Sequence, residues 1–512
     1  MKKIVFGLVA VAVLVSACAK NVVPSTEQLR ADDQQVIDEQ PADEGIPFRA
    51  VVSHDNIVKA ISESAGEIIT RWAEDEEIAM IYSVSGTPYK TVATIASVDG
   101  TGKATIEATL QSGVEDGAAV TLIYPASAAD GTTGNILSSI ISAQDGSFSI
   151  DRDIRKGSGT LNVEAGVATL APGASVPAAY AIVKFVLGGY YWNGSEWDDD
   201  VLEVSSLKIK NSEGVIANVT MVAADYEVFV TLPAMTSTPL WFEAVSSAGA
   251  PYIAKGVATF EAGMFYRPNM TMCTVGNIIG ANGKFYKDKA AAVSKGTTAA
   301  AIIAYIGDDT AEAGYTHGLA ISMKNIKGGT MRWKSNELAS GIDNGSGCQY
   351  TFYSDALAAK ESGVALSSIA AKDNETNYPA TYKAIHNDID LSAETGMTSS
   401  KPSSGTSDWF LPSLFQWSQI MNGLTGETSG LTTMNKTAYA LGANDLDKKI
   451  AAVTGSSNCW FTNLGSSKGI HTSTEYDADN IWYYNHTSGA YGAKLAYGPK
   501  TSSLYTRAVL AF

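Results

Sequence analysis

The sequence predicts a mainly β protein in which two antiparallel β-sandwich domains precede an α+β domain. Short segments of alternating polarity recur between residues 46 and 272, and Asp-Gly pairs that favour turns separate many of them. The 512 residues include 47 Gly and only 15 Pro, which fits a β-rich exported chain of about three domains. After residue 272 the composition shifts toward Ala, Gly, Ser, Asn, Tyr and Trp, which indicates a third domain of another class.

Residues 1–18 are a candidate export signal. Two lysines precede an apolar run over residues 4–15, and the run ends in the letters VSAC. Such a run is too short to span a bilayer and has the zones of a secretory signal. Its end is similar to a lipobox, so we expect a lipid on Cys18; an ordinary signal peptide with an incidental cysteine is the alternative. Residues 19–45 are polar and acidic without periodicity, and we expect a disordered tether there.

Charge and motif content narrow the class of function. Asp and Glu number 53 against 36 Lys and Arg, a formal charge of −17 that disfavours nucleic-acid binding. The five histidines show no metal-binding spacing, and neither a nucleophile elbow nor a phosphate-binding loop is present. We therefore expect no enzyme, no metal and no cofactor. Three cysteines follow Cys18: Cys348 and Cys459 can form a disulfide that leaves Cys273 free, or both can be buried thiols.

Two successive β-sandwich domains are expected over residues 46–177 and 178–272. The first strand signal is IPFRAVV at residues 46–52, whose alternate residues would face a core. Within the second domain, YWNGSEWDDD at residues 191–200 is expected to be an insertion loop. Its three aspartates lack the spacing of a helix–loop–helix calcium site, so a solvated loop is the favoured interpretation.

Four segments between residues 46 and 272 occur in an order that resembles the fimbrillin family. They are YPASAADGTTGNI, SAQDGSF, AIVKFVL and LWFEAVSSAGAPYIAKGVATFEAGMFYRPNM. Fimbrillins are the two-domain, transthyretin-like subunits of type V pili in Bacteroidetes-type bacteria. The resemblance implies two transthyretin-like sandwiches and transport to the outer membrane as a lipoprotein, which agrees with the candidate lipobox.

The same resemblance implies a maturation step and a mode of assembly. In that family a protease on the outer-membrane side cuts after an arginine that follows the first strand, and a strand from a neighbouring subunit fills the groove. Here the matching residue is Arg71; Arg49, inside the first strand, and Arg30, before it, are alternatives. An uncut lipoprotein in which Arg71 is a surface residue is the competing interpretation.

Residues 273–512 resemble C-type-lectin-like or formylglycine-enzyme-like domains. The resemblance rests on SDWFLPSLFQWSQIMNGL, HTSTEYDADNIWYY and the terminal SLYTRAVLAF, and it implies a last strand that returns beside the first. The first of these segments has apolar residues at helical spacing, so we expect a helix packed on a sheet, with Trp409 and Trp482 in the core. The Glu-Pro-Asn and Gln-Pro-Asp triplets of calcium-dependent sugar binding are absent from the sequence, and calcium binding is left open.

A ligand-contact surface is expected at EYDADNIWYYNH, residues 475–486. Aromatic rings stack on the apolar faces of sugars, and this stretch combines such rings with polar groups. Its candidate contact residues are Glu475, Asp477, Asn480, Tyr483 and Tyr484.

Together these features predict a structural and adhesive subunit of a surface pilus, placed at its tip. A shaft subunit ends in a strand given to its neighbour, whereas this chain continues from residue 272 to residue 512. The expected partners are other pilus subunits, a host or bacterial surface glycan or protein, and the outer membrane before processing. Two alternatives stay open: a lipid-anchored binding protein that does not polymerise, and an enzyme with a C-type-lectin-like catalytic domain.

Overall fold

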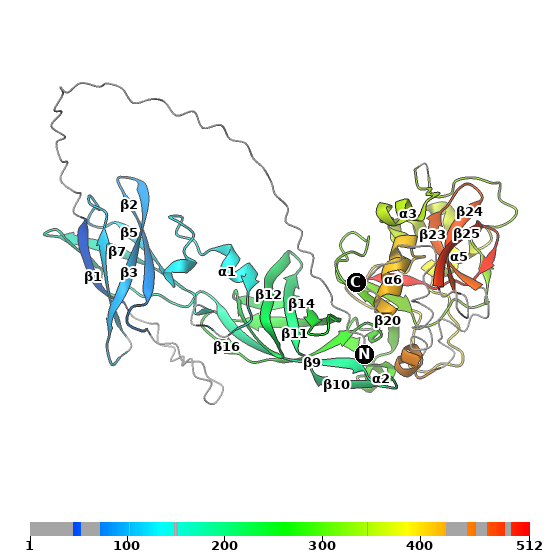
Figure 1. Cartoon of the computed structure of the whole chain (residues 1–512), viewed down its shortest axis with the longest axis horizontal. Helices are drawn as coiled ribbons and strands as arrows, with labels where there is room; N and C mark the ends of the chain where they lie inside the picture. The colour runs from blue at the N-terminus through cyan, green and yellow to red at the C-terminus, as the bar shows by residue number, and fades with distance from the viewer. Residues whose placement is uncertain are drawn as a thin grey trace, which may run out of the picture. The chain divides into compact units, whose positions relative to one another are not determined.

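The computed structural model describes residues 45–52, 72–101, 103–147, 149, 152–345, 347–425, 448–456, 468–486 and 493–512. This part of the chain is mainly β, as the sequence predicts (Figure 1). Cys18, Arg30, Arg71 and Cys459 lie outside the described residues.

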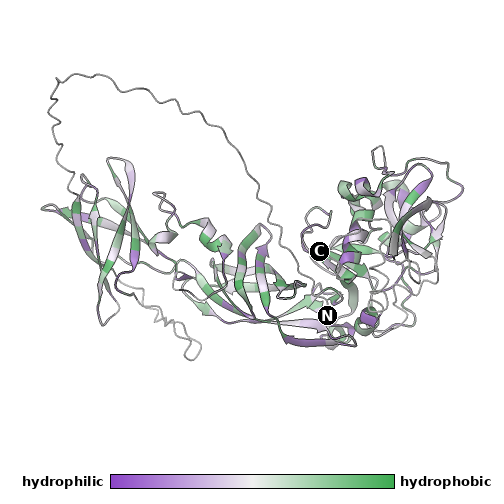
Figure 2. Cartoon of the chain, viewed as in Figure 1, coloured by the Kyte–Doolittle hydropathy of each residue, from purple (hydrophilic) through white to green (hydrophobic). Residues whose placement is uncertain are grey.

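The first domain is a closed barrel. Its strands follow the order β1-β4-β3-β2-β5-β7-β8 around the barrel. They are β1 (Ile46–Val52), β2 (Glu77–Val84), β3 (Thr87–Val98), β4 (Ala104–Leu110), β5 (Ala119–Tyr124), β7 (Arg155–Glu164) and β8 (Val167–Leu170). Buried and more exposed residues alternate clearly along β1, and Figure 2 shows residues of opposite hydropathy along the barrel strands, whereas β2 and β5 also bury residues on their outer face. Alternate side chains of a strand face the same side, so this pattern fills the barrel with one apolar core.

The first domain was predicted as a sandwich, but it is a closed barrel because of the position of β1. This strand pairs along its whole length with β4 and forms one parallel bridge, Phe48 to Ala168, with β8. The bridge joins the two ends of what would otherwise be an open sheet.

Three short elements follow β5 and precede β7 of the first barrel, and they link that barrel to the second domain by noncovalent contacts: η1 (Ala126–Ala128), α1 (Ser138–Ser142) and β6 (Ala143–Gln144). The strand β6 pairs in parallel with β12 of the second domain. The buried Gln144 side chain accepts a hydrogen bond from Thr231 N at 2.9 Å and donates one to Thr231 O at 2.9 Å. This exchange fixes the end of the connection to the second sheet.

The second domain is a 10-stranded sheet that folds over itself. Its main path is β10-β9-β17-β15-β14-β11-β12-β6, and β13 and β16 also pair with β9. Phe185 on β9 contacts Phe242 on β14 with ring centroids 5.3 Å apart, although two strands separate them in the sheet. The two halves therefore enclose a common core. The strands are β9 (Ala181–Trp192), β10 (Trp197–Val201), β11 (Val204–Asn211), β12 (Gly214–Asp225), β13 (Glu227–Leu232), β14 (Met235–Ser246), β15 (Pro251–Phe260), β16 (Phe265–Tyr266) and β17 (Asn269–Thr274).

The expected insertion loop at residues 191–200 is instead largely a β-hairpin. Strand β10 pairs antiparallel with the end of β9, and Trp197 lies opposite Trp192. Asn193 Oδ1 accepts hydrogen bonds from the backbone of Ser195 and Glu196 and so closes the turn between the strands. The polar composition that suggested a loop belongs to this turn and to the exposed aspartates of β10.

The C-terminal region holds a 5-stranded sheet of order β19-β18-β20-β21-β27, a 3-stranded sheet β23-β24-β25 and a pair β22-β26. Their bounds are β18 (Ile278–Gly280), β19 (Phe285–Tyr286), β20 (Ala299–Ile306), β21 (Gly318–Ser322), β22 (Met331–Arg332), β23 (Lys468–Glu475), β24 (Asn480–His486), β25 (Ala493–Pro499), β26 (Ser503–Leu504) and β27 (Val509–Ala511). The terminal strand β27 pairs with β21 and not with β18, so it does not return beside the first strand of this sheet.

The helices of this region are α2 (Lys289–Ser294), α3 (Tyr353–Ala359), α4 (Gly363–Ser367), η3 (Ala370–Lys372), α5 (Pro379–Ile385) and α6 (Leu414–Thr425). The predicted helix is confirmed as α6, and its apolar positions are buried. Gly423 lets α6 approach β20 closely, because a Cβ there would lie 2.1 Å from Ala304 O. Trp409 and Trp482 are buried, as predicted.

A buried cluster crosses the expected boundary between residues 272 and 273. Trp197, Ile253 and Cys273 belong to the same cluster as the core of the C-terminal region. Trp241 of β14 also stacks on His317, with ring centroids 4.0 Å apart. Separation of residues 46–272 from residues 273–512 would therefore expose these buried contacts.

Candidate functional site: a strand groove and an aromatic pocket

The first strand occupies a groove between β4 and β8. Its inward side chains Phe48, Ala50 and Val52 are buried, while Arg49 and Val51 point outward. Seven residue pairs join β1 to β4 in antiparallel register, from Ile46 opposite Leu110 to Val52 opposite Ala104. The strand is thus held by an unbroken ladder on one side and a single bridge on the other.

Removal of β1 would expose two strand edges and an apolar slot. The edge of β4 would lose its hydrogen-bond partners, and the barrel core would lose three apolar side chains. Unpaired edges readily accept another strand, because a new strand restores the backbone hydrogen bonds along its length. The alternation of β1 defines what would fit: apolar residues at every second position.

The chain re-enters the described structure at Trp72, directly after the predicted cleavage residue. The Trp72 ring is buried and contacts the edge of Tyr124, with ring centroids 4.9 Å apart. The guanidinium of Arg155 lies 5.8 Å from the ring centroid. These contacts would anchor a new N-terminus at Trp72 to the barrel.

The alternative cleavage residue Arg49 lies within β1. Its side chain is exposed and forms an ion pair of 3.2 Å with Glu107 on β4. A protease would need to separate β1 from β4 to reach this peptide bond, and the cut would leave half of the strand in place.

The predicted contact residues divide into buried and partly exposed groups. Glu475 and Tyr484 are buried, and Glu475 accepts hydrogen bonds from the backbone of Asp343 and Asn344 at 2.9 and 3.1 Å. Asp477 and Asn480 form the turn between β23 and β24, where Asp477 Oδ1 accepts from Asn480 N at 2.8 Å. Tyr483 is partly exposed. The structure brings these residues into one hairpin but does not place Glu475 or Tyr484 at its surface.

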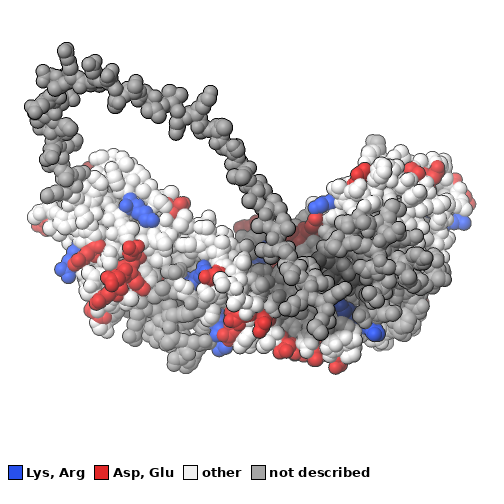
Figure 3. All heavy atoms as spheres, viewed as in Figure 1, with Lys and Arg blue, Asp and Glu red and all other residues white. Residues whose placement is uncertain are grey.

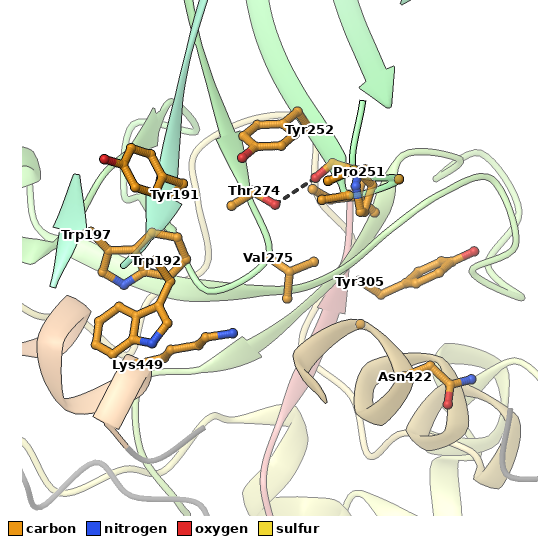
Figure 4. A pocket seen from close by; sticks show the side chains of 15 residues that line it. Tyr191, Trp192, Trp197, Pro251, Tyr252, Thr274, Val275, Tyr305, Asn422 and Lys449 are labelled. Carbon is orange, nitrogen blue, oxygen red and sulfur yellow. Dashed lines mark hydrogen bonds between the residues drawn. The ribbon is translucent and has the colours of Figure 1, made fainter. Parts of the chain in front are cut away.

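The structure also contains a pocket of about 530 Å³ that the sequence analysis missed (Figure 4). Its aromatic lining comes from the β9–β10 hairpin, β15 and β20, and its polar lining includes residues of α6. The lining side chains include Tyr191, Trp192, Trp197, Tyr252, Tyr305 and Asn422. Trp192 and Trp197 lie with ring centroids 5.7 Å apart at an interplanar angle of 58°.

The pocket combines apolar faces with a few polar groups. Its volume is within the range of small-molecule sites, about 300–1,000 Å³. The Thr274 hydroxyl is already engaged, since it donates to Pro251 O at 2.7 Å. The Trp197 indole nitrogen is buried and has no hydrogen-bond partner among the described residues. Aromatic faces with scattered polar groups suit a sugar ring, which has apolar C–H faces and hydroxyls at its rim.

The aromatic-rich segment YYWNGSEW is the feature of the sequence that could have indicated this pocket. Most of the lining could not be found that way, because twelve of its fifteen residues lie outside this segment, and Tyr305 and Asn422 lie more than a hundred residues further along the chain.

Four other features concern the cysteines, metal sites, membrane-spanning helices and surface charge. Cys348 and Cys273 are free thiols, and burial raises the pKa of both. No group of three or more His, Cys, Asp or Glu side chains suited to a metal ion occurs within the described ranges. No helix in this part of the chain is long and apolar enough to cross a membrane. Across the described surface visible in Figure 3, basic side chains are scattered and not gathered into one patch.

No protein-family model matches the chain, and no curated protein matches it. Similar solved structures include a fimbrial protein from Bacteroides ovatus, with 12% identity, 92% of this chain and 99% of that chain covered, and a TM-score of 0.32. A putative cell adhesion protein from Bacteroides fragilis has 10% identity, covers 44% of this chain and 92% of its own, and has a TM-score of 0.26. A fimbrial assembly protein from Parabacteroides distasonis has 10% identity, covers 44% and 90%, and has a TM-score of 0.25.

Proposed function

We propose that this chain is an adhesive subunit of a surface pilus and that it joins the pilus by strand exchange. In this scheme the exported lipoprotein is cut after Arg71, β1 leaves the first barrel, and a strand from another subunit takes its place. The observation that carries the proposal is the position of β1: a separate N-terminal strand that completes a barrel core and precedes a buried anchor at Trp72.

The burial and pairing of β27 support a place at the tip. The residues of β27 and the terminal Phe512 are buried, and β27 pairs with β21. Phe512 also exchanges backbone hydrogen bonds with Gly318, at 3.0 and 3.1 Å. Donation of this strand to a neighbour would open the C-terminal core. A subunit that accepts a strand and gives none would end a fibre.

The adhesive role is assigned to the aromatic pocket, with a glycan as the expected ligand class. The lining supports this assignment because ring faces and a few polar groups are the chemistry that sugars require. The segment 475–486 is a second candidate surface for ligand contact. Of its predicted contact residues, only Asp477, Asn480 and Tyr483 are partly exposed and can contribute.

Cleavage and exchange are tested together. Surface-released protein should begin at Trp72, and Arg71→Ala should abolish release, whereas Arg49→Ala should leave it unchanged. The cut protein should bind a partner's apolar-alternating peptide with slow dissociation, because the peptide regains a full ladder of backbone hydrogen bonds. Uncut protein within fibres would reject the scheme and favour a lipid-anchored binding protein that does not polymerise.

Ligand binding is tested on a glycan array with the full chain. Trp192→Ala should remove most of the signal, because it deletes one wall of the pocket. Val222→Ala is the matched control, since Val222 is 96% exposed and lies outside the pocket. Equal loss in both variants, or binding unaffected by Trp192→Ala, would reject the pocket as the site.

A further inference from the structure

A lysine and an asparagine of the C-terminal region meet in a buried site between β23 and α4. Lys372 is 1% exposed and Asn344 is 8% exposed. Lys372 Nζ donates to Asn344 Oδ1 and to Leu366 O, the latter at 3.1 Å. The amine also lies 5.1 Å from the centroid of the buried Trp333 ring. A primary amine is therefore held against a side-chain amide in a site closed to solvent.

The nearby carboxylates are bound to other lysines. Asp343 accepts from Lys334 Nζ at 2.9 and 3.1 Å and from Lys500 Nζ at 2.9 Å. Glu475 also accepts from Lys500. Within the described residues, Lys372 contacts only neutral acceptors by hydrogen bonds, so the cluster contains one lysine whose amine is not bound to a carboxylate.

This environment favours the neutral amine. Burial lowers the pKa of Lys372 to about 8, although Glu475 and Asp343 oppose the shift. Near neutral pH the fraction without a proton is therefore far larger than for an exposed lysine, and only that form has a lone pair for attack. The amine is a nucleophile prepared by desolvation.

A carboxyl group able to carry a proton lies beside the pair. Burial raises the pKa of Glu361 to about 7, and the charge of Glu475 raises it further while that of Lys372 lowers it. Asp343 is different: its bonds with Lys500, Tyr378 and Lys334 hold its pKa below the usual value, against the effect of burial. An ionised carboxylate such as that of Asp343 resists attack by an amine. The side-chain amide of Asn344 is neutral, so its carbonyl carbon is the better target.

We propose that Lys372 and Asn344 form an intramolecular isopeptide bond. Lys372 Nζ attacks Cγ of Asn344, the new Nζ–Cγ bond forms, and the bond between Cγ and Nδ2 breaks. One proton moves from Nζ to Nδ2, with Glu361 as its carrier, and the side-chain nitrogen of Asn344 leaves as ammonia. Atoms and electrons balance without an oxidant or another reactant.

The link would join the segment that precedes α3 to the end of η3. Asn344 precedes α3, and Lys372 ends η3, 28 positions further along the chain. Nδ2 of Asn344 donates to Ser473 O at 2.8 Å, so the asparagine is already oriented by β23 before reaction. A covalent closure here would tie these two segments beside the central strands and restrict their unfolding. The inference depends on these contacts alone and not on the proposed pilus role.

Peptide mapping of the unfolded full-length protein tests the proposal. Trypsin does not cut after an acylated lysine, so the linked product would join residues 335–360 to residues 361–383. Its mass should equal the sum of these two peptides, with Lys372 uncut, less one ammonia. Separate peptides with unmodified Asn344 and cleavage after Lys372 would overturn the proposal, and this result does not depend on any variant folding.

Variants test which residues form the link and which one carries the proton. Lys372→Arg should abolish the link, and Lys360→Arg, at an exposed lysine with the same trypsin specificity, should retain it. Asn344→Asp should lower the linked fraction, because an ionised carboxylate resists attack by the amine; any link that does form has the native linked mass, because loss of water from the acid yields the same amide. Glu361→Gln should reduce the linked fraction at least tenfold; native levels in this variant would overturn the assignment of proton transfer to Glu361.

Discussion

Truncation of Phe48 should destabilise the uncut first barrel strongly and should have no effect once β1 has been removed. The ring is 2% exposed and lies at the one position where β1 bridges both neighbours, opposite Ala108 on β4 and Ala168 on β8. Burial of a Phe side chain contributes about 1.5–3 kcal/mol, and the cavity left by Phe48→Ala adds to the loss. The expected cost is about 3–5 kcal/mol in the free energy of unfolding.

Hydrogen exchange of β4 measures this effect directly. The amides of β4 that pair with β1 should exchange faster in Phe48→Ala, because opening of the barrel becomes more frequent. Val51→Ala is the matched control on the same strand: Val51 is 56% exposed, so its truncation should change stability by only about 0.5 kcal/mol. After cleavage and addition of one donor peptide, both variants should behave as the native protein.

Equal protection of β4 in Phe48→Ala and Val51→Ala would refute the reasoning, because it would mean that β1 does not complete the core. A Phe48→Ala defect that persists after cleavage would show that β1 stays in the groove.

Three further predictions concern other parts of the chain. Burial lowers the pKa of His471 to about 4 from 6.5, so the folded protein keeps the imidazole neutral; stability should be full above pH 6.5 and fall as the pH drops toward 4, and His471→Gln should flatten this part of a urea-midpoint profile. Gly276→Ala should destabilise by about 1–3 kcal/mol in urea unfolding, because its φ is +100° and a Cβ would lie 2.6 Å from Trp197, whereas Gly194→Ala, with the same φ and open space, should cost less. Cys18→Ala should abolish labelling by a fatty-acid probe and retain the precursor; normal labelling of that variant would exclude Cys18 as the lipid site.

The sequence predicted those elements whose signal is local. IPFRAVV alternates with period two, and a strand with one buried face requires that period, so β1 was found with its bounds. The segment that forms α6 repeats its apolar residues at helical spacing for the same kind of reason. The hairpin of β9 and β10 was missed because its turn residues and aspartates have the composition of a loop, and the pairing with β9 is what makes it a strand.

Functional sites depend more than strands and helices do on residues that are far apart in the sequence. Arg71 and Cys18 were proposed from short motifs, and they lie outside the described residues. Glu475 was expected at a surface because its neighbours are polar and aromatic, but the burial of a carboxylate depends on its partner. That partner, Lys500, is 25 positions away and gave no signal in the sequence.

The sequence by itself determined the class of this protein, mainly β with an α+β end, and the faces of its clearest strand and helix, because periodicity along a chain records which side is buried. Only the tertiary structure decided that β1 closes a barrel, that β27 is locked against β21, and that Lys372 meets Asn344. Each of these depends on contacts between positions far apart in the chain. Such contacts follow from the packing of the whole core, which no local pattern of residues records.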